Sequence, residues 1–117
     1  MPTTPKCTIH IVRNPENERE DDVIHMYDDP DFEEMVRITF RSERDPRREF
    51  FLDVPRAVNY VSTILRTLTH DVVPFERVQV TTMIHPAVLY HVSDLNDGAT
   101  RCLIEDTVES ALRRPVS

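Results

Sequence analysis

Two runs of alternating apolar and polar residues in the middle of the chain constrain its fold more than any other feature. In the first run, MVRITFR over residues 35–41, apolar residues occupy every second position. The second run, EFFLDV over residues 49–54, has the same period. Such a period places apolar side chains on one face of an extended strand. Because only the polar segment 42–48 separates the runs, they predict a β-hairpin with one buried face.

The residues that follow this hairpin have the spacing of an amphipathic helix. Pro55 suits the first helical turn, and either Asp53 or Val54 would lie at the N-cap. Apolar residues then recur at intervals of three and four, a spacing that places them on one side of a helix. These residues are Ala57, Val58, Val61, Ile64, Leu65 and Leu68. The apolar stripe needs an apolar cover, which we expect the sheet to supply.

Three further elements are expected downstream. Residues 75–80 alternate again and predict a third strand. A second helix is expected from about Pro86, and a last helix from about Ala99 to Arg114, where Pro115 stops it. The sequence therefore predicts an α+β fold, in which a small mixed sheet of three main strands packs against three or more helices.

The N-terminal third is interpreted separately. Residues 8–12 and 23–27 are short, carry β-branched residues at alternating positions, and flank a highly polar stretch. They predict either a hairpin with a long charged loop or a partly ordered arm. We therefore divide the chain into an acidic N-terminal arm or hairpin, residues 1–33, and a main domain, residues 34–114.

Composition narrows the classes of function. The length of 117 residues suits one domain with a modest core, and the formal net charge is −7. That charge has the wrong sign for binding nucleic acid, and no apolar run approaches the ~20 residues of a membrane span. The N-terminus lacks the apolar segment of a secretory signal. We therefore expect a cytoplasmic or nuclear protein with reduced thiols at Cys7 and Cys102.

Few residues form a pattern typical of catalysis. The five histidines include no pair at i, i+4, and the single glycine cannot build a phosphate-binding loop. We therefore expect no enzyme activity, no catalytic or metal-binding residues and no cofactor. The alternative is a small metal-dependent enzyme that uses His10 and His25, which could face each other across the N-terminal hairpin with Cys7 nearby.

The order of the predicted elements also resembles a known family. The segment FFLDVPRAVNYVSTILRTL over residues 50–68 is similar to the strand and helix of the BTB/POZ fold, and closest to elongin C and the F-box-binding SKP adaptor. Its residues Ala57, Ser62, Ile64, Leu65 and Leu68 carry that likeness. The segment 76–95 resembles the following strand and helix, and residues 35–40 resemble the first strand. The last helix lacks the Asn-aromatic pair through which family members contact a cullin.

The resemblance implies a protein-interaction adaptor. Such an adaptor bridges a substrate receptor, through an amphipathic helix of the partner, to a cullin–RING ubiquitin ligase or a related complex. The alternative is a self-associating scaffold of the BTB/POZ type, a homo-oligomer. The residues expected to bind the partner lie in the last two predicted helices: Val88, Leu89, Val92, Leu95, Leu103, Ile104, Val108 and Leu112.

Overall fold

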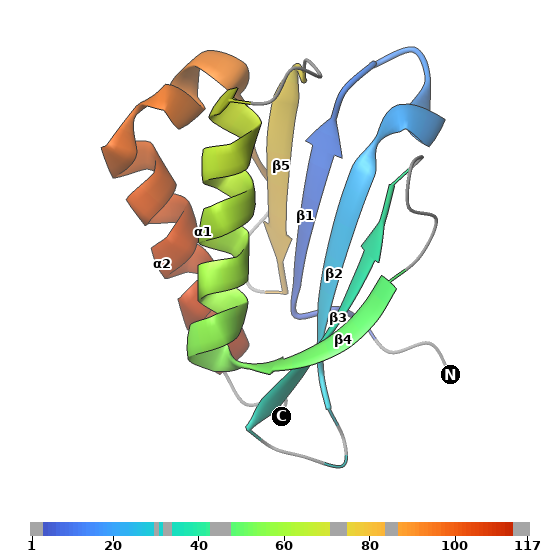
Figure 1. Cartoon of the computed structure of the whole chain (residues 1–117), viewed down its shortest axis with the longest axis vertical. Helices are drawn as coiled ribbons and strands as arrows, with labels where there is room; N and C mark the ends of the chain where they lie inside the picture. The colour runs from blue at the N-terminus through green and yellow to red at the C-terminus, as the bar shows by residue number, and fades with distance from the viewer. Residues whose placement is uncertain are drawn as a thin grey trace.

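The computed structural model describes residues 4–29, 31, 34–42, 48–70, 75–83 and 87–113, without the side chains of residues 18, 69, 70 and 92. Six strands, two α-helices and two 3₁₀ helices follow one another along these residues (Figure 1). Their order is β1 Cys7–Val12, η1 Glu18–Glu20, β2 Asp22–Asp28, β3 Met35–Arg41, β4 Arg48–Asp53, α1 Val54–His70, β5 Arg77–Thr82, β6 Val88–His91, η2 Val92–Asn96 and α2 Gly98–Arg113.

The six strands form one sheet in the order β4-β3-β2-β1-β5-β6, and all neighbours are antiparallel. The first four strands follow one another as a meander. Helix α1 then carries the chain across the sheet, so that β5 pairs with the free side of β1 and β6 adds outside β5. Strand β1 is therefore central, with β2 on one side and β5 on the other.

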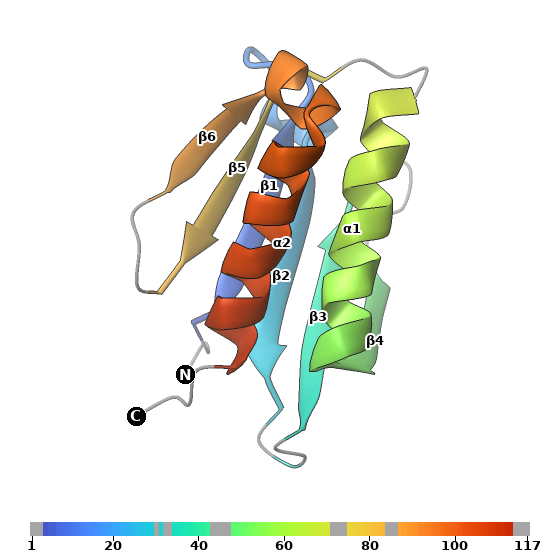
Figure 2. The same cartoon turned by 90° about the vertical axis from the view of Figure 1, so that its left-hand side faces the viewer.

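Both α-helices lie on the same face of the sheet, side by side (Figure 2). Helix α1 packs against β3 and β4, whereas α2 packs against β1 and β5, and the helices contact each other. The buried residues of α2 are Ile104, Val108, Ala111 and Leu112, which recur at helical spacing. The two helices thus bury their apolar stripes against the sheet, as an amphipathic pattern requires.

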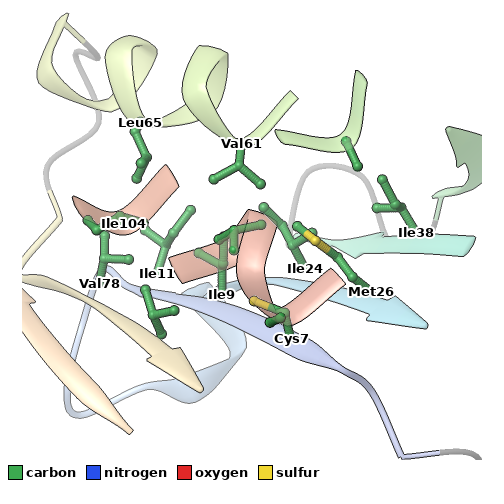
Figure 3. Close-up of a cluster of buried hydrophobic side chains, with 14 of the residues drawn as sticks. Cys7, Ile9, Ile11, Ile24, Met26, Ile38, Val61, Leu65, Val78 and Ile104 are labelled. Atoms are coloured by element: carbon green, nitrogen blue, oxygen red, sulfur yellow. The ribbon is translucent and has the colours of Figure 1, made fainter. Parts of the chain in front are cut away.

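The core lies between the helices and the sheet (Figure 3). The sheet contributes alternate residues of each central strand, and the helices contribute their apolar stripes from above. The residues that are completely or almost completely buried include Cys7, Ile9, Ile11, Ile24, Met26, Ile38, Val61, Leu65, Val78 and Ile104. The opposite face of the sheet, which we call the open face, carries the remaining alternate residues of each strand, including Thr8, His10, His25, Thr39, Gln79 and Thr81.

The two α-helices begin at aspartate caps. The Oδ1 atom of Asp53 accepts a hydrogen bond of 2.9 Å from the N–H of Arg56, so of the two expected caps Asp53 is the one used. Asp97 accepts in the same way from the N–H of Ala99, at 3.0 Å. These local signals explain why the predicted starts of both helices agree with the structure to within about a residue.

The predicted fold class is wrong in its sheet and in its number of helices. A mixed sheet of three main strands under three or more helices was expected, but the described residues form a six-stranded antiparallel sheet with two α-helices. The helix expected from Pro86 is the main error. Its apolar residues have helical spacing, yet Val88–His91 pair with β5 as a strand and only Val92–Asn96 turn, as a 3₁₀ helix. The expected arrangement of three main strands under three or more helices therefore does not describe this chain.

The N-terminal hairpin is formed, and it lies in the middle of the sheet. Residues Cys7–Val12 pair with Asp22–Asp28, in a register that sets Thr8 opposite His25. The division expected at residue 33 falls between β2 and β3, which pair along their length. The expected hairpin of the main domain is also present as β3 and β4, and the expected strand at residues 75–80 is β5.

Candidate functional site

The eight residues expected to bind a partner divide into two groups. Four of them lie in the core with at most 4% of their surface exposed, and these are Leu95, Ile104, Val108 and Leu112. Three are exposed: Val88 by 43%, Leu89 by 51% and Leu103 by 56%. The side chain of Val92 lies outside the described residues. The structure therefore leaves two of the exposed residues on β6 and one on α2 as candidates for contact with a partner.

The two exposed apolar residues of β6 point to opposite faces of the sheet. Val88 pairs with the buried residue Val80, so its side chain lies on the helix side. Leu89 pairs with Gln79 and lies on the open face. Met83, in the connection between β5 and β6, is also 56% exposed. We call Met83, Val88 and Leu89 together the β6 edge patch.

Strand β6 is the last strand on its side of the sheet, and among the described residues no strand pairs with its outer side. The N–H of His91 donates to Oδ2 of Asp94 at 2.9 Å, which shows that this N–H points away from β5. Along an antiparallel strand, residues two apart direct their backbone groups to the same side. Leu89 therefore presents its N–H and C=O outward, where another strand could bond to them.

The other outer strand, β4, has a different character. It carries the charged residues Arg48, Glu49 and Asp53, and α1 follows it directly. Charged side chains on an outer strand discourage pairing with another chain. The sequence of β6, Val-Leu-Tyr-His, carries no carboxylate, lysine or arginine. Of the two outer strands, β6 is therefore the one whose chemistry suits a protein contact.

The histidines whose side chains the structure describes do not come together in the way that a metal site requires. His10 and His25 both lie on the open face, as the metal hypothesis expects, on neighbouring strands and two positions out of direct register. Cys7 lies on the opposite face, completely buried. Within the described ranges, no group of three His, Cys, Asp or Glu side chains is placed to hold a metal ion. His85 lies outside the described residues.

The two cysteines are not joined to each other, and their surroundings differ. Burial raises the pKa of the Cys7 thiol to about 12, so this thiol stays protonated at neutral pH. Cys102 lies on α2 with its side chain exposed.

Comparison with known proteins identifies no relative. No family model matches the chain, no curated protein is similar, and no solved structure matches its fold. The resemblance to elongin C and the SKP adaptor thus stays a prediction from apolar spacing, without support from a relative. Among the described helices, none is both long enough and apolar enough to cross a membrane.

Proposed function

We propose that this chain is a protein-interaction module, and that the β6 edge accepts an extended segment of a partner protein as an additional strand. The observation that carries the proposal is the outer strand β6, which is uncharged and has Leu89 exposed on one face and Val88 on the other. Addition of a strand to an exposed sheet edge is a common way to recognise peptides. The main-chain bonds give affinity, and pockets for alternate side chains give specificity.

The energy available at this edge is modest. Each main-chain hydrogen bond contributes about 0.5–1.5 kcal/mol net. Burial of a whole leucine or valine side chain contributes about 1.5–3 kcal/mol, and Leu89 and Val88 each have roughly half of that still to gain. A four-residue strand can therefore support a weak or moderate contact. We expect a partner that also touches Met83 to bind more tightly than one that contacts the strand alone.

This mode differs from the one that the family resemblance implies. A groove for a partner helix between the last helices would need Ile104, Val108 and Leu112, which the monomer already buries in its own core. The expected role as a cullin–RING adaptor came from a resemblance that implied three main strands under three or more helices, an arrangement that the described residues do not have. The general class, a protein that binds another protein, is what we retain.

The test is a comparison of two matched variants. Leu89→Asp places a charge at the centre of the proposed contact, and Ser110→Asp places the same charge on an exposed position of α2. Proteins captured from a cell extract by the wild type are quantified by mass spectrometry. A partner retained by Ser110→Asp and lost by Leu89→Asp is then produced alone, and the segment that binds is mapped.

Hydrogen exchange on the reconstituted complex gives the decisive result. The proposal requires slower exchange at the Leu89 amide when the partner segment is bound. Equal capture by both variants, or unchanged exchange along β6, would show that the contact lies elsewhere.

A second candidate is self-association through the same edge, since every copy of the chain carries it. Two β6 strands would then pair across a twofold axis. Light scattering of the purified chain over a range of concentrations distinguishes self-association from binding of a different protein. A dimer that Leu89→Asp dissociates and Ser110→Asp does not would support the scaffold, whereas a strict monomer would oppose it.

A further inference from the structure

The open face of the sheet carries two adjacent cross-strand rows of side chains, polar except for Val23, that the proposed function does not use. The pairing of the strands defines these rows. One row runs through Gln79, His10, Val23 and Arg41, and the next runs through Thr81, Thr8, His25, Thr39 and Glu49. Side chains opposite each other in a row lie about 4.5–5.5 Å apart at Cβ, and diagonal neighbours lie about 7–8 Å apart. His10 and Arg41 therefore flank Val23, and His25 is a diagonal neighbour of both.

His10 is held in place by a buried carboxylate. Its Nε2 atom lies 2.7 Å from Oδ2 of Asp21, whose side chain is only 4% exposed. Because an ionised carboxylate can only accept, Nε2 of His10 carries the donated hydrogen. The ring of His10 itself is about one-third exposed, so part of it remains accessible from solvent.

His25 is oriented by a hydroxyl group and lies in a positive field. Its Nδ1 atom is hydrogen-bonded to Oγ1 of Thr8, 3.0 Å away. Burial lowers the pKa of His25 from its ordinary value, and the positive charges of Arg41 and His10 lower it further. Arg41 forms no ion pair with any residue in the described part of the chain. Three groups that can carry positive charge are thus gathered at one place.

This local charge contrasts with the rest of the molecule. The protein carries a net charge of −7, yet Glu49 is the only acid in the two rows, and its Oε2 atom lies 3.3 Å from Nη1 of Arg37. The other members of the rows include Thr8, Thr39 and Gln79, which are neutral and can donate hydrogen bonds. A donor-rich surface that includes the permanently charged guanidinium group of Arg41 is complementary to a small anion, even though the protein as a whole is acidic and Asp21 lies behind His10.

We propose that His10, His25 and Arg41, on the open face of β1, β2 and β3, bind the phosphate group of a small phosphomonoester. A phosphate has several acceptor oxygens, so it can accept hydrogen bonds from donors that two rows and three strands present on the same face of the sheet. The guanidinium group of Arg41 can donate two parallel hydrogen bonds to it. A single carboxylate would use fewer of these donors.

Binding of the anion is coupled to protonation of His25. A bound phosphate offsets the positive charges of Arg41 and His10, so it raises the pKa of His25 back toward the ordinary value. The groups that face His25 are Thr8 and His10 from β1, with Asp21 behind His10, and Arg37, Thr39 and Arg41 from β3; the ring of Tyr27, on β2 itself, lies 6.1 Å from that of His25, and Glu49 lies one strand further. Of these groups, only the two carboxylates favour the protonated form of His25.

Nuclear magnetic resonance titration of the whole chain tests the site with three probes. The probes are inorganic phosphate, a nucleoside 5′-monophosphate and the same nucleoside without phosphate, at constant ionic strength set by sodium chloride. Saturable shifts are expected at the amides of His10, His25 and Arg41 and at the two histidine rings with the first two probes and not with the third. Binding of the nucleotide without binding of inorganic phosphate would overturn the proposal, because the phosphate would then not be the recognised group.

Two variants with the same change of charge provide the control. Arg41→Gln removes the guanidinium group of the site, and Arg56→Gln removes an exposed one on α1. We expect Arg41→Gln to weaken phosphate binding by at least about tenfold, the factor that corresponds to 1.4 kcal/mol, and Arg56→Gln to leave it unchanged. In the wild type, phosphate is expected to raise the pKa of His25 relative to chloride. An equal effect of the two variants, or a pKa of His25 that is the same in both salts, would refute the site.

Discussion

Lys6 is the only lysine in the chain, and the structure buries it. Its Nζ atom lies 2.7 Å from Oδ1 of Asp28 and donates to the C=O of Leu112 at 3.2 Å. Leu112 belongs to the last turn of α2, whose final carbonyl groups lack partners within the helix and carry partial negative charge. Lys6 thus ties the C-terminal end of α2 to the segment that precedes β1. We predict that Lys6→Met destabilises the protein.

The expected loss follows from the contacts. A hydrogen bond that involves a charged group contributes about 1.5–3 kcal/mol, and a cation at a helix C-terminus adds about 0.3–1 kcal/mol. Methionine fills a similar volume and removes the desolvation cost of the ammonium group, which opposes part of that loss. Asp28 is 40% exposed and regains water when its partner is removed. We therefore expect a net loss of about 1–3 kcal/mol, or roughly 4 °C in Tm for each kcal/mol.

Urea unfolding followed by circular dichroism measures this change, with Arg113→Met as the control. Arg113 lies on the same end of α2, but its contact with Glu109 is exposed, so its loss should alter stability by less than about 0.5 kcal/mol. The m-value should stay the same in both variants, because the surface exposed on unfolding does not change. If Lys6→Met unfolds at the same or a higher urea concentration than the wild type, the desolvation of the ammonium group outweighs its contacts and the reasoning fails.

Three further predictions concern the core and its titratable groups. In the native protein at pH 8, a thiol reagent should modify Cys102 quickly and Cys7 only on unfolding, as mass spectrometry of the labelled chain would show. The pKa of the Cys7 thiol is raised to about 12, so the stability that depends on the protonated thiol is complete below pH 9 and is lost as the pH rises toward 12. The pKa of His25 is lowered, so the stability that depends on its neutral ring is present above about pH 6.5 and is lost as the pH falls. Cys7→Ala and His25→Asn should each reduce the corresponding change with pH in the urea concentration at the midpoint of unfolding. Finally, Ile24→Ala should reduce the free energy of unfolding by about 2–5 kcal/mol, whereas Leu103→Ala on the surface should change it by less than about 1 kcal/mol.

Local patterns in the sequence predict most of the elements. The alternation over residues 35–41 and 49–54 gives the hairpin of β3 and β4, and the stripe that ends at Leu68 gives α1. In each case a single period persists over the element and a turn or cap bounds it. Such signals are local, so they remain visible without knowledge of the rest of the fold.

The errors occur where the arrangement in space decides the outcome. Val88 and Leu89, together with Val92, have a spacing that suits a helix, but Val88–His91 are short, apolar and adjacent to β5, which offers a free side to pair with. A run of four residues is too short for its apolar period to distinguish a helix from a strand. The central place of the N-terminal hairpin is also not a local property, because it depends on β5 crossing over to pair with β1.

The exposed outer strand follows from the geometry of the layers. The five gaps between six strands, each about 4.8 Å, span roughly 24 Å, whereas two helices packed 8–10 Å apart cover about 20 Å. Helix α1 begins where β4 ends and therefore lies over that side, and α2 packs on β1 and β5, so β6 is the strand that neither helix packs against closely. A chain that used this strand only as the end of the sheet would gain solubility from a charged residue at position 88 or 89. The presence of valine and leucine there, with Met83 also exposed in the connection between β5 and β6, is explained if another polypeptide covers the edge.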